Sequence, residues 1–536
     1  MQQPLLDLDV LGLICESIHD AHTVLSFSLV CSALHPMAIK RLLSAVKPVR
    51  LKNVRTIRTY HACIFADPQS RLPLVRALNI SIFEVEQEVR QEVVQCLLEL
   101  LERATHLDSL ILPYPFWTFR CLIDPRIPAA IARLTTLREL GLLRACNEMQ
   151  EIVTSTCSVA TLRVLRISVN DLVFTQENER RVASSHLDKL LRYLAPTLEV
   201  LEITTGFIDY ENTPGTRYPA VRTLMAGEQH NFLRADILIH KFPALDGTLG
   251  VGRIYQVWRE DRQAQRRMRA FNQEQQRRRS WTHLDGVIGD VVTVFGLGLI
   301  CPVRHLMLDD VCHDTKDQMV EVLRATPLAC LKLTATVYGT GDDPFLEDLF
   351  PPEVVPTLTN LVFVLKCTFG GRYPQESAFQ PVQWTELLQK VIGSIRILHL
   401  TCLRLLVHYN VNVTDPFFKL STKDFVRGII DLDHAHLAAE LMTAMPSLQY
   451  VFLSKGGEYS SGPYKKWDRW LAHSAWKRTP SGIPETLDAD SAEQMLLDED
   501  LILSKSDEYA LGFQIENPWA KDAMVPLPLP ESPQLE

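Results

Sequence analysis

A spacing of apolar residues recurs along the chain, most clearly in LRVLRISVNDL, the stretch that starts at Leu162. Its last positions alternate, so Leu165 and Ile167 would face one side of a short strand while Arg166 and Ser168 face the other. The pattern apolar-x-x-apolar-x-apolar also begins at Val75, Leu107, Leu137, Leu198, Val221, Val303, Leu328, Leu358, Ile395 and Leu448.

Helical patterns lie between several of these expected strands. One helical stripe comprises Val85, Val89, Val93, Leu97 and Leu101, and shorter stripes occur in SHLDKLLRYLA, KDQMVEVLRATP and HAHLAAELMTAMP. A unit of one strand and one helix cannot close a core alone, so neighbouring units must stack. The sequence therefore predicts an α/β protein of repeated strand–helix units over residues 51–478. A single α/β sheet with leucine-rich strands is the alternative.

The stretch from Leu162 resembles the leucine-rich repeat family. The family template L-x-x-L-x-L-x-x-N-x-L is matched in full by Leu162, Leu165, Ile167, Asn170 and Leu172. The resemblance implies a solenoid with parallel strands on its concave face and helices outside, in which Asn170 bonds neighbouring backbone. Other starts lack the asparagine and their spacing varies, which is typical of an irregular, degenerate array.

The first fifty residues lack the strand pattern and contain three amphipathic helical stripes. Asp20 precedes the second stripe as a plausible cap, and Pro36 stands where the third would begin. A unit this small buries too little to be self-sufficient, so its apolar surface needs the rest of the chain or a partner. The stripes are Leu11, Ile14, Cys15 and Ile18, then Val24, Phe27, Val30, Cys31 and Leu34, then Ile39, Leu42, Leu43 and Val46.

The segment LDLDVLGLICESIHDAHTVLSFSLVCSALHPMAIKRLLSAV resembles the F-box, although Asp7 stands where the family usually has proline and Leu34 where many members have tryptophan. The resemblance implies that residues 1–50 form a three-helix domain, which binds a Skp-type adaptor and, through it, a cullin scaffold. A helical cap on the end of the repeats is the alternative. The resemblance assigns the adaptor interface to Leu6, Val10, Leu11, Ile14, Ile18, Leu25, Leu29, Val30, Cys31, Leu34, Leu42 and Val46.

Composition narrows the class of protein. The 536 residues include 64 acidic and 55 basic side chains, and the net charge of -9 argues against a surface that coats nucleic acid or anionic membrane. The N-terminus has acidic residues where a secretory signal is basic, and the apolar run VVTVFGLGLICPV is too short to cross a membrane. Twelve cysteines without a C-x-x-C pair are typical of reduced thiols. We expect a cytoplasmic or nuclear protein.

Arginines concentrate in WREDRQAQRRMRAFNQEQQRRRSW, between the pattern starts at Val221 and Val303. We expect a solvated helix or flexible insertion at about residues 255–285, because the run lacks the interleaved aromatic side chains of single-strand binders. A nucleic-acid or acidic ligand is the alternative, and its site would be Arg266, Arg267, Arg277, Arg278 and Arg279.

The sequence contains no recognisable catalytic motif. Cys301, His305, Cys312 and His313 lack the paired spacing of a zinc site, so we expect no metal. There is no phosphate-binding loop and no nucleophile elbow, so we expect neither a cofactor nor an enzyme activity. Asp433 in DLDHAHL is expected to cap the helix that follows it.

The chain changes character after its last pattern start. GPYKKWDRWLAHSAWKR places Trp467, Trp470 and Trp476 at helical spacing, which predicts a C-terminal capping helix. The acidic, proline-punctuated residues 479–536 are expected to be largely flexible.

These resemblances imply a function without catalysis by the chain itself. They predict a substrate receptor of an SCF-type ubiquitin ligase, whose F-box binds the adaptor while the repeats bind a protein target. The candidate target-binding residues are the outward Arg163, Arg166 and Ser168. An interaction scaffold outside the ubiquitin system is the alternative.

Overall fold

The computed structural model describes residues 7–501, except for residues 19–20, 44–48, 83, 114, 144–146, 168–189, 206–214, 229–232, 255–258, 339–343, 370–382, 413–419 and 461–465. The chain divides into two compact units. Unit 1 comprises residues 1–228 and 237–245, and unit 2 comprises residues 229–236 and 246–536. The division falls inside α11 (Ala235–Lys241).

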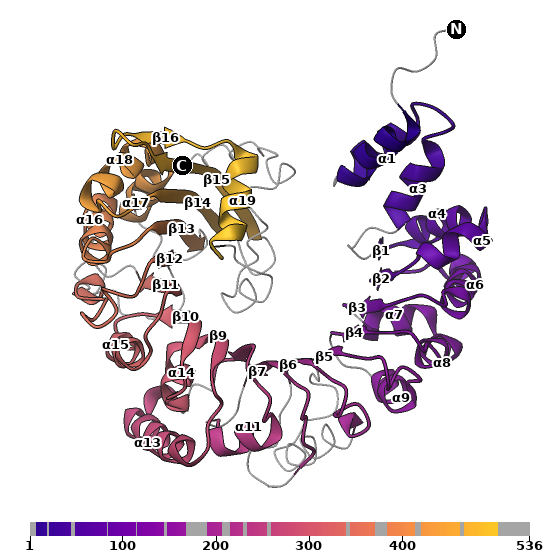
Figure 1. The fold of residues 1–536 in the computed structure, drawn as a ribbon, viewed down its shortest axis with the longest axis horizontal. Coiled ribbons are helices and arrows are strands. Elements are labelled where there is room, and N and C mark those ends of the chain that lie inside the picture. Colours follow the sequence, from indigo (N-terminus) through magenta and orange to yellow (C-terminus); the bar gives the residue numbers. More distant parts are fainter. Residues whose placement is uncertain are drawn as a thin grey trace. The chain divides into compact units, whose positions relative to one another are not determined.

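In unit 1, strands and helices alternate and the strands pair in chain order, always in parallel (Figure 1). The strands are β1 (Val49–Leu51), β2 (Ala77–Ile80), β3 (Ser109–Leu112), β4 (Glu139–Leu142), β5 (Val164–Ile167), β6 (Val200–Thr205) and β7 (Thr223–Glu228). The helices are α1 (Leu8–Ser17), α2 (Ala21–Ser28), α3 (His35–Leu43), α4 (Val54–Phe65), α5 (Pro68–Arg71), η1 (Leu72–Leu74), α6 (Gln87–Arg103), α7 (Pro115–Leu122), α8 (Arg126–Ala132) and α9 (Asn147–Ser155).

One leucine from each of six neighbouring strands forms a continuous buried row through unit 1. The row is in register from β2 to β7, and its members are Leu78, Leu110, Leu140, Leu165, Leu201 and Leu224. Each of them is fully buried. They occupy the second apolar position of the sequence pattern, so the pattern predicted both the strands and the face that they bury.

Unit 2 continues the same alternation. Strands β8 to β14 pair in parallel and in chain order, and β15 and β16 add in antiparallel fashion. The strands are β8 (Thr248–Val251), β9 (Leu284–Asp290), β10 (Val303–Val311), β11 (Cys330–Tyr338), β12 (Asn360–Phe369), β13 (Cys402–Asn412), β14 (Tyr450–Ser460), β15 (Lys466–Arg478) and β16 (Pro484–Thr486). The helices are α13 (Arg262–Arg278), α14 (Val291–Leu297), α15 (Lys316–Ala325), η2 (Pro344–Leu346), α16 (Trp384–Ile395), α17 (Leu420–Ile430), α18 (His434–Ala444) and α19 (Ala489–Asp498).

A second buried row runs through the sheet of unit 2 and consists of Leu249, Val287, Leu306, Leu331, Leu361, Leu403 and Val451. Helices α14 to α18 lie on one face of this sheet (Figure 1). The row points to that face, because the alternate residues, such as Val362, pack against α19 on the other. The chain is therefore an α/β protein with a mostly parallel sheet, as the sequence predicted.

One pattern start was placed wrongly. Ile395 is the last residue of α16, and the strand expected there is β13, whose pattern begins five residues later at Leu400. Both IRILHL and LTCLRL fit the same loose spacing. The structure selects the second because Leu403 and Leu405 are buried in register with Leu361 and Phe363 of β12.

The C-terminal capping helix was also wrong, because Lys466–Arg478 form β15. This strand pairs antiparallel along the whole length of β14. An exposed edge of β14 would leave a row of unpaired backbone groups, and tryptophan suits a strand at least as well as a helix. Trp476, whose ring packs edge-on against His434 at 6.3 Å, is 5% exposed.

Two other expectations concern the C-terminal half. Asp433 caps α18, with its Oδ1 accepting hydrogen bonds from the backbone N–H of Ala435 at 2.9 Å and of His436 at 3.2 Å, as the sequence predicted. Residues 479–501, in the segment expected to be largely flexible, include β16 and α19. The rest of that segment lies outside the described residues.

Candidate partner-binding surfaces

Helices α1, α2 and α3 pack around a small core of their own, formed by Cys15, Val24 and Ala38. Asp7, which replaces the proline of the family pattern, caps α1, because its side chain accepts a hydrogen bond from the N–H of Asp9 at 3.4 Å. The Arg41 guanidinium on α3 donates to the carbonyl of Ile18 at 3.2 Å and so ties α3 to the end of α1. Three helices are present where the sequence predicted three, but α2 ends at Ser28, so Val30, Cys31 and Leu34 of the second stripe lie in the turns that follow it.

This small core leaves much of the apolar surface of α1, of α2 and of the turn after α2 exposed to solvent. Leu29 is 83% exposed and Val30 72% exposed. We define the N-terminal apolar surface as Leu8, Val10, Leu13, Ile14, Leu25, Leu29 and Val30, all of them exposed. They are seven of the fourteen exposed large apolar side chains among the described residues. Exposed apolar side chains concentrated in this way make the N-terminal apolar surface a candidate for partner binding.

The residues that the F-box pattern assigned to the adaptor differ in accessibility. Val10, Ile14, Leu25, Leu29, Val30 and Cys31 are exposed, and Leu11, Ile18 and Leu42 are half-buried. Leu34 is buried, so its role in this structure is packing. Leu6 and Val46 lie outside the described residues. Sequence reasoning missed Leu8 and Leu13, whose position on the same short helix was the available signal.

The two candidate target-binding arginines, Arg166 in β5 and Arg163 just before it, are already engaged in ion pairs within unit 1. Arg166 lies between two carboxylates, with Nη1 3.0 Å from Glu139 of β4 and Nε 3.1 Å from Glu202 of β6. Burial raises the pKa of Glu202, and the charge of Arg166 acts against that rise. Arg163 pairs with Glu199 at 3.3 Å, just before strands β5 and β6. Ser168, Asn170 and Leu172 lie outside the described residues.

The arginine-rich run contains α13, which packs against α14 and α15 through polar side chains. Asn272 is fully buried, and its Nδ2 donates to the carbonyls of Leu233 and Gly296, both at 2.9 Å. Its Oδ1 accepts from the N–H of Ala235 at 2.9 Å. Arg269 stacks over the Phe295 ring at 4.6 Å and donates to the Phe295 carbonyl. One side of α13 is therefore structural.

The opposite side of α13 carries arginines that the sequence analysis named as an alternative site for a nucleic-acid or acidic ligand. Arg266, Arg267, Arg277, Arg278 and Arg279 are exposed. Arg277 and Arg278 both pair with Glu274 on the same helix, at 3.1 and 3.4 Å. Their local charge is thus partly compensated, which weakens the field that a phosphate backbone would meet.

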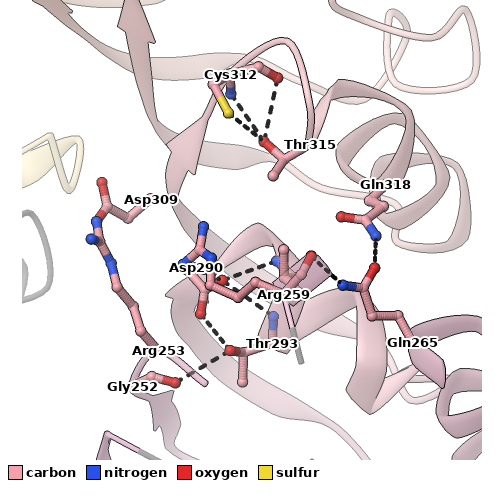
Figure 2. A network of polar contacts seen from close by, with 11 residues as sticks. Gly252, Arg253, Arg259, Gln265, Asp290, Thr293, Asp309, Cys312, Thr315 and Gln318 are labelled. Atoms are coloured by element: carbon pink, nitrogen blue, oxygen red, sulfur yellow. Dashed lines mark hydrogen bonds and ion pairs between the residues drawn. The ribbon is translucent and has the colours of Figure 1, made fainter. Parts of the chain in front are cut away.

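Next to α13, a polar network joins the ends of β8, β9 and β10 (Figure 2). Asp290, 2% exposed, caps α14 by accepting from the N–H of Val292 at 3.1 Å, and it pairs with Arg259 at 3.5 Å. Arg253 binds the buried Asp309 at 2.8 Å. These arginines precede α13 and hold adjacent strand ends together, so we assign the network to fold stability.

Two features are absent from the part of the chain that the structure describes. It contains no group of three histidine, cysteine or acidic side chains placed to hold a metal ion. None of its helices is both long and apolar enough to span a membrane. Of the candidate ligands, Cys301 is buried, and the two ring nitrogens of His305 face the Asp285 carbonyl and the Asp500 carboxylate.

Sequence reasoning missed the contact of α19 with the sheet of unit 2. Ala492 and Leu496 of α19 are buried against side chains of β12, β13 and β14. The available signals were Asp488, which caps α19 through the N–H of Ser491 at 2.9 Å, and the four-residue spacing of the two apolar residues. The acidic, proline-rich composition of the surrounding segment favoured a prediction of flexibility, so neither signal was used.

Neither a scan against protein-family models nor a search of curated proteins gives a match to this chain.

Proposed function

We propose that the chain is a substrate-recognition subunit of an SCF-type ubiquitin ligase. In this proposal α1, α2 and α3 bind a Skp-type adaptor, and the strand–helix units, a degenerate leucine-rich-repeat solenoid, bind a protein target. The chain supplies no catalytic group. It raises the effective concentration of the target beside the ubiquitin-charged enzyme, which makes transfer nearly intramolecular.

One observation carries the proposal, namely the N-terminal apolar surface. Burial of a large apolar side chain is favourable by about 1.5–3 kcal/mol, so several exposed side chains on α1, on α2 and in the turn after α2 represent a considerable driving force for association. The core of Cys15, Val24 and Ala38 holds the helices together, so these side chains are presented on a formed scaffold. The F-box resemblance names the partner that such a surface would bind.

The test is capture of a purified Skp-type adaptor by the full chain. Ile14→Asp and Leu29→Asp place a charge in the N-terminal apolar surface, and we expect each to reduce capture by at least about tenfold, which is the effect of about 1.4 kcal/mol. Ile397→Asp is the matched control, because Ile397 is 45% exposed and lies in unit 2. If the unmodified chain captures no adaptor, the proposal is wrong, and an interaction scaffold outside the ubiquitin system becomes the leading hypothesis.

A further inference from the structure

The sheet of unit 2 has an apolar strip on the face opposite to α14–α18. Val362 and Val364 of β12 are buried there, as are Leu406 of β13 and Phe452 of β14. The intervening residues, such as Phe363, point to the helix-covered face, because side chains alternate along a strand. Both faces of this part of the sheet are therefore apolar, and the strip must be covered to remain out of water.

Helix α19 covers the strip, on the side of the sheet away from α16–α18 (Figure 1). Ala492 and Leu496, one helical turn apart, are buried against it, and Met495 is partly buried beside them. Gln494, Leu497 and Asp498 are exposed. Only one narrow stripe of α19 is thus used for binding.

The chain turns back at the C-terminal end of α19, and the leucine that follows the turn bonds to the last turn of the helix. The N–H of Leu501 donates to the carbonyl of Leu496 at 2.9 Å, and the N–H of Asp500 donates to the carbonyl of Leu497 at 3.2 Å. Asp500 has φ 52°, the left-handed conformation that normally favours glycine at this position. Leu501 folds back and joins Leu496 in the cluster on the strip.

Polar side chains of the strands bind this helix end. Asn360 Nδ2 donates to the carbonyl of Glu499 at 3.0 Å, and the buried Arg404 donates to the carbonyl of Leu501 at 2.7 Å. The Asp500 carboxylate lies 3.6 Å from Lys332 Nζ and 3.4 Å from His305 Nε2. Four strands therefore supply donors to backbone and carboxylate oxygens that a helix leaves unsatisfied at its C-terminus.

We propose that this face of unit 2 is a binding site for an amphipathic helix of a partner protein, and that α19 occupies it as an internal ligand. The matching helix has two apolar residues four apart, then an acidic residue and a leucine directly after its end, as in Ala492, Leu496, Asp500 and Leu501. The proposal takes from the proposed function only the idea that the repeats bind a protein, and it holds whether or not the adaptor binds.

The size and attachment of α19 favour exchange. A ten-residue helix is too short to be stable alone, so α19 depends on the strip for its structure. The only strand between it and β15 is β16, which has three residues. When α19 leaves, an apolar strip with donors at one end becomes accessible, and such a patch favours a protein ligand of the same pattern.

The first experiment is hydrogen exchange on the unmodified full chain. We expect the α19 amides to exchange through local opening, at least about tenfold faster than the amides of β12 and β13, because only the stripe of α19 is lost on opening. If the α19 amides exchange only with those of β12 and β13, α19 is a permanent part of the core and the proposal is wrong.

The second experiment measures binding of a fluorescent peptide of residues 484–501 to the full chain. A chain with Leu496→Asp, which releases α19, is expected to bind the peptide at least about tenfold more tightly than the unmodified chain. A peptide with Asp500→Lys, or a chain that also carries Arg404→Met, is expected to bind at least about tenfold more weakly. The proposal is wrong if the unmodified peptide and the Asp500→Lys peptide bind equally well. It is also wrong if the Leu496→Asp chain has a normal circular dichroism spectrum and binds no peptide.

A released chain that fails to fold contradicts the proposal as well, since α19 is then essential to the core. Adaptor capture by the same Leu496→Asp chain separates the two hypotheses. We expect it to be unchanged, because α1–α3 do not take part in this site, and a loss of capture by Ile14→Asp has no bearing on peptide binding.

Discussion

The guanidinium of Arg166 lies 3.1 Å from the carboxylate of Glu202 on the neighbouring strand. The same guanidinium lies 3.0 Å from Glu139 on the strand at its other side. A residue that the sequence proposed for target recognition thus forms ion pairs with two carboxylates, one on each neighbouring strand. Arg166 could bind a target only by giving up these ion pairs. Its role in this structure is therefore electrostatic.

Arg166→Met tests this role. We expect it to lower the free energy of unfolding by about 1 kcal/mol near pH 7.5, because Glu139 and Glu202 then face each other without a cation. The pKa of Glu202 is already raised by burial and would rise further. A carboxyl with a raised pKa in the folded state favours folding below its unfolded pKa, and that advantage is lost as pH rises through the folded value.

The deficit of Arg166→Met is therefore expected to be smaller near pH 4.5 than near pH 7.5, as measured by denaturant unfolding. Arg163→Met is the matched control, since its partner Glu199 is 55% exposed and the pair contributes little. An equal deficit at both pH values would show that packing of the Arg166 stem, rather than its charge, is responsible.

Asn272→Leu tests whether α13 is part of the fold. The change leaves the carbonyls of Leu233 and Gly296 and the N–H of Ala235 without their hydrogen bonds in a buried place. We expect a loss of about 3 kcal/mol in the free energy of unfolding. Arg267→Ala, on the exposed side of the same helix, is expected to change it by less than about 0.5 kcal/mol. Similar losses for both would contradict the assignment.

Much of the fold follows from the spacing of apolar residues, because the same position must be buried in every strand. The rows through Leu165 in unit 1 and Leu361 in unit 2 are the direct result. The sequence pattern did not predict β8 and β9, because the spacing of apolar residues is broken in both strands. Gly289 takes the third apolar position in β9, and an added Cβ there would meet Val251 of β8 and Val294 of α14.

The candidate sites were predictable only where the relevant contacts are local. The apolar residues of α1 and α2 are close together in the sequence, and Asp433 caps α18 through residues only two and three positions away. The pairs of Arg166 and the cover formed by α19 depend on partners distant in sequence. Leu501, for example, meets Arg404 across 97 positions, and no short-range pattern records that proximity.

Acid is expected to destabilise the chain through His434. Burial lowers the pKa of His434 to about 4, and the nearby positive charge of Lys455 acts in the same direction. The unfolded residue titrates near 6.5, so between these values the unfolded state binds a proton that the folded state does not. Stability contributed by neutral His434 is present above about pH 6.5 and is lost as pH falls toward 4.

His434→Gln removes this proton while an amide can still hydrogen-bond Ser474, which lies 2.7 Å from His434 Nδ1. Between about pH 7 and pH 5, we expect the unmodified chain to lose about 2 kcal/mol more stability than the variant. Denaturant unfolding at both pH values measures the difference. His106→Gln, at an exposed position, is the control, and a reduced pH dependence in that variant instead would contradict the assignment to His434.

Gly457 on β14 and Gly393 on α16 are expected to respond to alanine in opposite directions. Gly457 stands in register with Tyr409 of β13, and an added Cβ would overlap the buried Tyr409 ring. Gly457→Ala is therefore expected to destabilise by about 1–3 kcal/mol, because the core is closely packed. Gly393 has nothing within 4 Å of such a Cβ, so Gly393→Ala is expected to stabilise by about 0.5 kcal/mol through helix propensity.

The melting temperatures of the two alanine variants measure this contrast, and a second substitution identifies its cause. Replacing Tyr409 by the smaller leucine costs stability on its own, because Tyr409 is 1% exposed and its ring fills the interior. If overlap with the ring is the reason for the loss in Gly457→Ala, the double variant Gly457→Ala/Tyr409→Leu is less destabilised than the two single effects added together. Additive effects would instead place the cost of Gly457→Ala in the backbone of β14.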